Sequence, residues 1–163
     1  MRVIIHDLDK SYDELLKGKC DLTIMADGEY APCQGCFDCW LKTPAKCKIK
    51  DKLVEVCRIV GKADEIVIVT RNFYGTYSPE IKNIIDRSIG ISTTFSTYRK
   101  GQMHHVSRYG WHSLLMIVSY GEHSEEEKAT FMHIAERNAL NHSFKNTKNV
   151  FIASKDELLE VIA

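Results

Sequence analysis

Runs of apolar and β-branched residues alternate along this chain with segments whose apolar residues recur at helical spacing. The apolar runs predict five strands, at residues 2–6, 21–25, 65–70, 113–120 and 149–153. The run 65–70 is almost continuously β-branched, which is typical of a strand covered on both faces of a parallel sheet.

Helical patterns separate these runs, and the clearest begins at Pro79. Its buried stripe is formed by Ile81, Ile84, Ile85 and Ile89. Further helices are predicted at residues 11–16, 51–61, 124–141 and 155–162. Their signals are capping boxes of Ser11 with Glu14 and of Ser124 with Glu127, a cap at Asp51 and a stop at Gly61.

Strands that alternate with helices predict an α/β fold with a mainly parallel sheet. Five strands in a chain of this length favour the flavodoxin-like three-layer sandwich with strand order 2-1-3-4-5. In such sheets, ligands bind outside the carboxyl ends of the strands. We therefore expect a site at the loops that follow His6, Thr70 and Tyr120.

The 163 residues predict one domain, spanning 1–163, with two irregular segments. Residues 30–50 carry a cysteine cluster. Residues 90–110 are rich in Ser, Thr, Tyr, Arg and His without a helical or strand period, and they predict a long loop that packs on a second subunit. Within this loop, we interpret His104, His105 and Arg108 as polar contacts with that subunit rather than as a site.

Charge and hydropathy exclude several classes of function. Lys and Arg number 22, as do Asp and Glu, whereas a general nucleic-acid or anionic-membrane binder would carry a basic excess. The longest apolar run, residues 114–118, is too short to cross a membrane. Charged residues from Asp7 onward interrupt any signal-peptide pattern, so we expect a cytoplasmic protein with reduced cysteines. Neither a G-x-G-x-x-G dinucleotide motif nor a P-loop is present.

Four of the six cysteines, Cys33, Cys36, Cys39 and Cys47, follow the pattern C-x2-C-x2-C-x7-C. Four thiolates can hold either an iron–sulfur cluster or a tetrahedral zinc ion. The third cysteine at the same short spacing favours a [4Fe–4S] cluster, because zinc sites more often use two separated pairs. Zinc and free thiols with a labile disulfide remain alternatives. Cys20 and Cys57 stand apart and are expected in the core.

Two stretches together resemble the iron–sulfur flavoproteins and related NADPH-dependent FMN reductases, which are flavodoxin-like. One runs from Cys33 through Cys36-Phe-Asp-Cys39-Trp to Cys47, and the other is Tyr74-Gly-Thr-Tyr-Ser-Pro-Glu-Ile-Lys82 followed by Ile85-Asp-Arg87. The resemblance implies FMN, a [4Fe–4S] cluster on the four cysteines, and a homodimer or tetramer. It also implies NAD(P)H or a redox protein as partner.

By position, the resemblance assigns three loops to the flavin. The loop after the third strand would border the ring with Thr70, Arg71, Asn72, Phe73, Tyr74 and Gly75. The loop after the fourth strand would contribute Ser119, Tyr120 and Gly121. The phosphate would meet Lys10 and Ser11, in a branch of the family whose phosphate loop is shortened.

The shortened loop keeps a second function open. It has no glycine and carries Asp7, Asp9, Asp13 and Glu14, whose carboxylates would repel a phosphate dianion. The first hypothesis is therefore a flavin-dependent oxidoreductase or electron-transfer protein. The second is a binding or assembly module that has lost FMN and keeps a four-cysteine zinc or thiol site.

Overall fold

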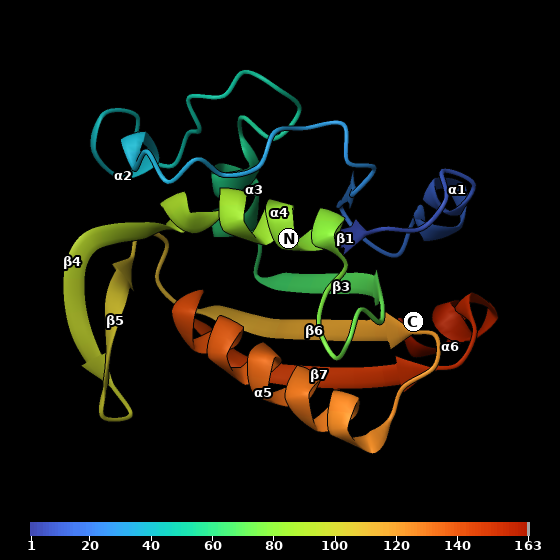
Figure 1. Ribbon diagram of the computed structural model, residues 1–163. Coiled ribbons are helices and arrows are strands. Elements are labelled where there is room, and N and C mark those ends of the chain that lie inside the picture. The colour runs from blue at the N-terminus through green and yellow to red at the C-terminus, as the bar shows by residue number, and fades with distance from the viewer. Residues whose placement is uncertain (163) are drawn as a thin grey trace.

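Five parallel strands form the central sheet of the computed structural model, which describes residues 1–162 (Figure 1). They are β1 (Arg2–His6), β2 (Leu22–Met25), β3 (Glu65–Arg71), β6 (His112–Tyr120) and β7 (Phe144–Ile152). Their order is β2-β1-β3-β6-β7, and every neighbouring pair is parallel. The predicted α/β class and flavodoxin-like strand order are confirmed.

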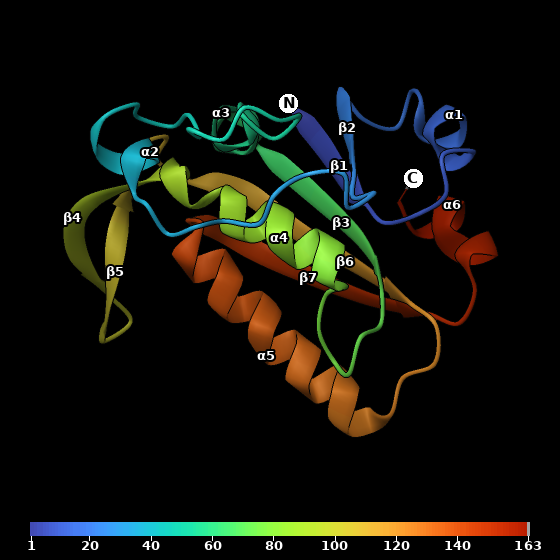
Figure 2. The ribbon, with the colours of Figure 1, turned by 45° about the horizontal axis from the view of Figure 1, so that its top comes forward.

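Helices cover both faces of this sheet (Figure 2). One face carries α3 (Val56–Lys62), α4 (Pro79–Arg87) and α5 (Glu125–Asn141), and the other carries α1 (Tyr12–Leu16) and α6 (Leu158–Val161). Successive strand residues point to opposite faces. Ile66 and Ile68 of β3 therefore pack under α3, α4 and α5, whereas Val67 and Val69 pack on the opposite face, under α1 and α6. Burial on both faces explains the continuous apolar run of this strand.

Local signals at the helix starts are confirmed at α4, which begins at Pro79, and at α5, and they are wrong at α1 and α3. Ser124 and Glu127 form the predicted capping box. Ser11 does not cap α1, because it adopts a helical conformation itself and its side chain makes no capping bond. Asp51 is not a helix cap either, since α3 begins five residues later at Val56.

Gly61 lies inside α3 instead of ending it. The ring of Tyr109 packs so closely on this position that any Cβ there would overlap it. The glycine therefore allows α3 to pack closely on the segment that leads into β6. Its role is packing, so it does not mark the end of the helix as the sequence predicted.

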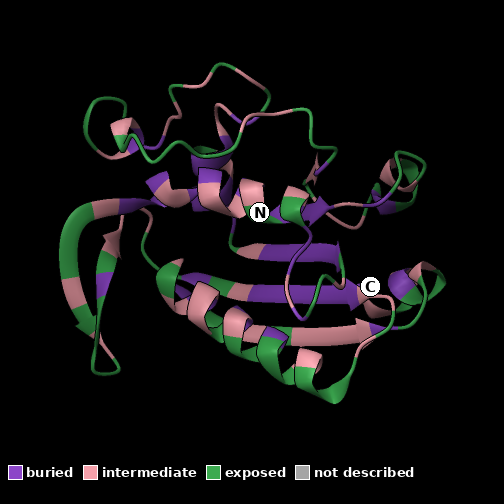
Figure 3. Cartoon of the chain, in the orientation of Figure 1, coloured by how far each residue is buried: buried purple, intermediate pink, exposed green. Residues whose placement is uncertain are grey.

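Residues 92–107 form an antiparallel hairpin, so the predicted long loop at 90–110 is wrong. β4 (Ser92–Arg99) and β5 (Gln102–Ser107) are joined by Lys100 and Gly101, with φ of 49° and 76°. Two successive positive φ values give a two-residue turn of type I′, which matches the twist of paired strands. The hairpin stands away from the sheet and is largely exposed (Figures 1 and 3), so no buried face imposes the alternation by which strands are recognised.

Three short elements complete the chain: α2 (Asp38–Leu41) in the cysteine segment, and the 3-10 turns η1 (Ile89–Ile91) and η2 (Lys155–Glu157). The fifth strand starts at Phe144, earlier than predicted, because this edge strand carries Lys and Asn on its exposed positions. Within the described residues, no helix is both long enough and apolar enough to traverse a lipid bilayer.

Candidate functional site

The four clustered cysteines line one cavity of about 70 Å³ beside the carboxyl end of α4. Gly35 and Phe37 flank Cys36 with φ of 61° and 57°, and these two left-handed residues curl the chain around the cavity. Cys33 and Cys36 are exposed, whereas Cys39 is 8% exposed at the start of α2. The structure thus brings the whole predicted ligand set together.

The spacing of the thiols around this cavity bears on the kind of metal centre that they could hold. Across residues 1–162, no three His, Cys, Asp or Glu side chains lie close enough to share a single metal ion. Four thiolates on one zinc ion lie about 3.8 Å from one another, given its bond length of about 2.3 Å. An iron–sulfur cubane instead binds its thiolates at separate corners and fills the space between them.

Arg87 and Asp51 close the base of the cysteine segment. Arg87 is buried, and its two Nη atoms donate to the two carboxylate oxygens of Asp51 at 2.9 and 2.8 Å. Arg87 also donates to the carbonyl oxygen of Ala31 at 2.6 Å, and Asp51 accepts from the Ala31 amide at 3.1 Å. Because residues 31 and 51 flank the segment, this set of bonds ties both its ends to α4.

Asp86, the neighbour of Arg87 in α4, has a different partner. Asp86 pairs with Lys82 at 2.5 Å on the exposed side of α4, and Arg87 pairs with Asp51. The signal for Arg87 was present in the sequence, since it falls on the helical face of Ile81 and Ile84 where a charge is out of place.

Arg87 brings a positive charge to the lining of the cavity. Burial lowers the pKa of Arg87, but Asp51 and the neighbouring Cys47 thiolate outweigh it, so that this pKa is raised and the guanidinium stays charged. Hydrogen bonding to Arg87 in turn lowers the pKa of Asp51. Lys42 and Lys46 are engaged outside the cavity with Asp38 and Glu55, at 3.3 and 2.9 Å.

Cys39 meets a fifth cysteine that the sequence placed in the core. Cys57 is fully buried in α3, and its Sγ lies 3.1 Å from the carbonyl oxygen of Arg87. The interaction with the Cys57 side chain is the main cause that lowers the pKa of Cys39. A Cβ on Gly90 would lie 2.8 Å from the Cys57 Sγ and 3.2 Å from the Cys39 Sγ, so only glycine lets η1 pack on this pair.

The hairpin packs on the cysteine segment of its own chain. Arg108 donates to the carbonyl oxygens of Trp40 at 2.7 Å and of Gly90 at 3.2 Å. The ring of His105 lies on Trp40 with centroids 4.6 Å apart, and His104 Nδ1 is 3.1 Å from Asn141 Oδ1. All three residues contact their own protomer, and their contact with a second subunit stays a prediction.

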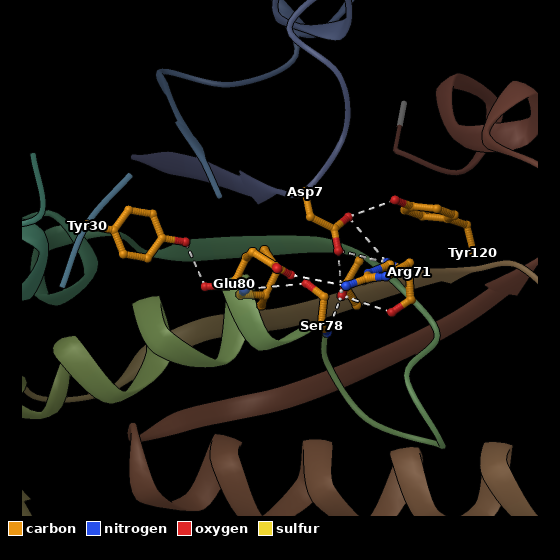
Figure 4. Close-up of polar contacts among 8 residues, drawn as sticks. Asp7, Tyr30, Arg71, Ser78, Glu80 and Tyr120 are labelled. Carbon is orange, nitrogen blue, oxygen red and sulfur yellow. Dashed lines mark hydrogen bonds and ion pairs between the residues drawn. The ribbon is translucent and has the colours of Figure 1, made fainter. Parts of the chain in front are cut away.

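A second polar cluster lies at the carboxyl ends of the strands (Figure 4). The carboxylate of Asp7 accepts bonds from the Arg71 amide at 3.0 Å, the Thr70 hydroxyl at 3.2 Å and the Tyr120 hydroxyl at 3.0 Å. Burial and the nearby Asp7 charge raise the pKa of Tyr120. Three predicted flavin residues therefore do come together, but around a carboxylate of the protein itself.

The loop after β3 is held by its own bonds. Asn72 donates to the carbonyl oxygen of Glu122 at 2.8 Å and accepts from the Gly75 amide at 3.0 Å. Phe73 and Tyr74 form an edge-on pair at the exposed tip, with centroids 5.1 Å apart. Of the other predicted residues, Ser119 is buried with its hydroxyl 2.9 Å from His123 Nε2, and Gly121 begins the next loop with φ of 108°.

The phosphate end offers little to FMN. Lys10 and Ser11 are exposed, and α1 spans only five residues with Asp13 and Glu14 in its first turn. Asp7 already occupies the Arg71 amide that would otherwise face an anion. The ring end, with Phe73 and Tyr74 exposed, is compatible with a flavin ring, whereas the phosphate end does not fit a phosphate dianion.

Tyr30 and Glu80 connect the two clusters. The Tyr30 hydroxyl donates to the carbonyl oxygen of Glu80 at 2.8 Å, and the Glu80 carboxylate lies 3.4 Å from Arg71 (Figure 4). The start of the cysteine segment is thereby tied to the amino end of α4 and to the strand-end cluster.

Known proteins resemble the chain in sequence and in fold. Residues 9–135 match the family described as NADPH-dependent FMN reductase. Iron–sulfur flavoproteins of Methanocaldococcus jannaschii and Archaeoglobus fulgidus are 33% and 36% identical over 76 and 70 residues, or 47% and 43% of this chain. These matches span only 38% and 33% of the relatives' own length. An FMN-dependent NADH-azoreductase from Bacillus anthracis, solved with FMN, shares the fold with a TM-score of 0.52 at 14% identity, covering 99% of this chain and 93% of that one.

Proposed function

Since the chain belongs to the NADPH-dependent FMN reductase family, we propose that it is a flavin-dependent oxidoreductase or electron-transfer protein that also carries a [4Fe–4S] cluster. The observation that carries the proposal is the cavity lined by Cys33, Cys36, Cys39 and Cys47. A cluster supplies one-electron transfer when bound, and a flavin supplies exchange between two-electron and one-electron donors.

The protein's own contribution at the cysteine cavity is positioning and charge. Asp51 and Arg87 fix the ends of the ligand loop, while Arg108 fixes α2 through the carbonyl oxygen of Trp40. The Arg87 guanidinium beside Cys47 favours an anionic cluster and would raise its reduction potential relative to a neutral environment.

The flavin would bind through its ring, at the loop that carries Phe73 and Tyr74. Because the carboxylate of Asp7 takes the place of an anion, we propose that the phosphate contributes little and that the flavin exchanges readily with solution. NAD(P)H, which the family name implies, or a redox protein would supply electrons. We further propose a homodimer, with the exposed hairpin residues Phe95 and Tyr98 in the contact.

Anaerobic purification with iron and sulfide supplied tests the proposal. We expect brown protein with about four iron and four sulfide per chain, as the four thiolates require. We also expect riboflavin and FMN to bind with affinities within about threefold of each other, since the phosphate gains little. Colourless protein with one zinc and no flavin affinity would instead establish the binding or assembly module.

A further inference from the structure

A groove of about 670 Å³ opens next to the cysteine cavity, at the opposite end of the sheet from the strand-end cluster. Its walls come from the cysteine segment, α4 with η1, the hairpin and the carboxyl end of α5, which meet at this end of the molecule in Figure 2. Cys33, Gly35, Phe37 and Ile89 line both the groove and the cysteine cavity. A molecule in the groove would therefore lie against the cysteine loop.

One wall of the groove is aromatic and rigid. Trp40 is fixed by the bond from its Nε1 to the carbonyl oxygen of Ile89 at 2.8 Å. Phe37 and His105 both contact Trp40, and their ring centroids lie 4.9 and 4.6 Å from the ring centroid of Trp40. Phe37 is held in a left-handed conformation and stays 44% exposed, so its apolar face is presented to a ligand. Aromatic walls of this kind bind planar conjugated rings.

The opposite wall carries two amides one helical turn apart on α5. Asn138 Nδ2 donates to the Tyr77 hydroxyl at 3.2 Å, which leaves its carbonyl oxygen without a partner in the described part of the chain. Asn141 Oδ1 pairs with His104 Nδ1 at 3.1 Å, which leaves its NH2 group without one. Since His104 Nε2 is buried and unpaired, the proton is best placed on Nδ1, because an orphaned lone pair costs less than an orphaned N–H.

The side chains that line the groove carry no net charge. Lys82 and Asp86 neutralise each other at 2.5 Å on its rim. Burial lowers the pKa of His142 to about 4, so that its ring is neutral at neutral pH. A free acceptor on Asn138 and a free donor on Asn141 complement a ligand edge that carries one N–H and one C=O side by side.

We propose that this groove is a binding site for a neutral, planar heterocycle with a cyclic amide edge, stacked against Phe37 and Trp40 and hydrogen-bonded to Asn138 and Asn141. Pteridinediones and the isoalloxazine ring of flavins share this chemistry. The site is distinct from the strand-end loops at which the family's flavin is expected.

Equilibrium dialysis of the full chain tests the site, with lumazine as probe and 1,3-dimethyllumazine, which lacks the N–H groups, as matched ligand. We expect saturable lumazine binding and at least about tenfold weaker binding of the dimethyl derivative, the value of one good hydrogen bond. Asn141→Asp keeps the acceptor for His104 but removes the donor, and it should weaken lumazine binding by about tenfold. Trp40→Leu should weaken it by a similar factor.

The control variants are Asn146→Asp on the edge strand and Trp111→Leu, which change the same residue types outside the groove and should leave affinity unchanged. Equal affinity for both lumazines, or affinity that neither groove substitution lowers, would overturn the assignment. Iron content, measured on the same samples, reports separately on the proposed function.

Discussion

Arg87 and Asp51 form a two-pronged ion pair, at 2.9 and 2.8 Å, that holds the two ends of a cysteine segment to a helix far along the chain. The side chain of Arg87 is fully buried, whereas that of Asp51 is 18% exposed. Removing one partner of such a pair leaves the other charge buried without compensation, which is costly. The cysteine segment and the fold therefore depend on the same contact.

Asp51→Asn is therefore expected to cost about 3 kcal/mol of unfolding free energy. It should also lower the iron content, since the ends of the ligand loop lose their anchor to α4. Urea unfolding and iron analysis of one preparation measure both effects. Asp86→Asn is the matched control, because its exposed pair with Lys82 is worth less than about 1 kcal/mol. Equal destabilisation by both variants would contradict the role given to Asp51.

A comparison of the Cys36→Ser and Cys20→Ala variants tests which cysteines are ligands. Cys36 lines the cavity, whereas Cys20 lies half-buried near α1 on the other side of the sheet. We expect Cys36→Ser to lose most of the bound iron and to make residues 30–50 sensitive to protease, because metal binding orders its loop. Cys20→Ala should keep its iron. Unchanged iron in Cys36→Ser would remove Cys36 from the ligand set.

Sequence reasoning found the sheet and the grouping of four cysteines because both depend on local signals. The β-branched run of β3 and the spacing from Cys33 to Cys47 are visible in single segments of the chain. It missed Asp51 with Arg87 and Asp7 with Tyr120, because each pair joins residues that are distant in sequence and only packing brings them together. The hairpin was missed for a different reason: both its faces are largely exposed, so its turn at Lys100-Gly101 was the one clear signal.

Gly61 is expected to tolerate no side chain while Tyr109 is present. Gly61→Ala places a methyl group where the Tyr109 ring lies, and overpacking of this kind costs about 1–3 kcal/mol. The double variant with Tyr109→Ala removes the obstacle. A double-mutant cycle by urea unfolding should therefore show that Gly61→Ala costs less in the Tyr109→Ala background. Additive effects would mean that α3 moves aside at no cost.

The proposed dimer places the hairpin in the contact. Phe95 and Tyr98 are 72% and 75% exposed on β4, so both aromatic side chains are available for a contact with a second copy of the chain. Replacing both with Asp should convert the dimer to a monomer in sedimentation experiments without loss of helical circular dichroism. Leu15→Asp, at an exposed apolar site on α1, is the control and should remain dimeric. A wild-type chain that is monomeric at micromolar concentration would refute the dimer.

Stability should fall as the pH drops below neutrality, and His142 should account for part of the fall. Burial lowers its pKa from 6.5 to about 4, and the neighbouring His112 adds to the effect. A folded-state pKa below the unfolded value stabilises the fold fully above about pH 6.5 and is lost as the pH falls toward 4. His6 and His112, whose pKa values are also lowered by burial, act in the same direction.

Urea titrations of His142→Asn test this prediction. The variant should lose about 2 kcal/mol less unfolding free energy than the wild type between pH 7 and pH 5. His133→Asn, at an exposed position, is the control and should lose as much as the wild type. Parallel curves for wild type and His142→Asn would show that the ring is solvated in the folded protein.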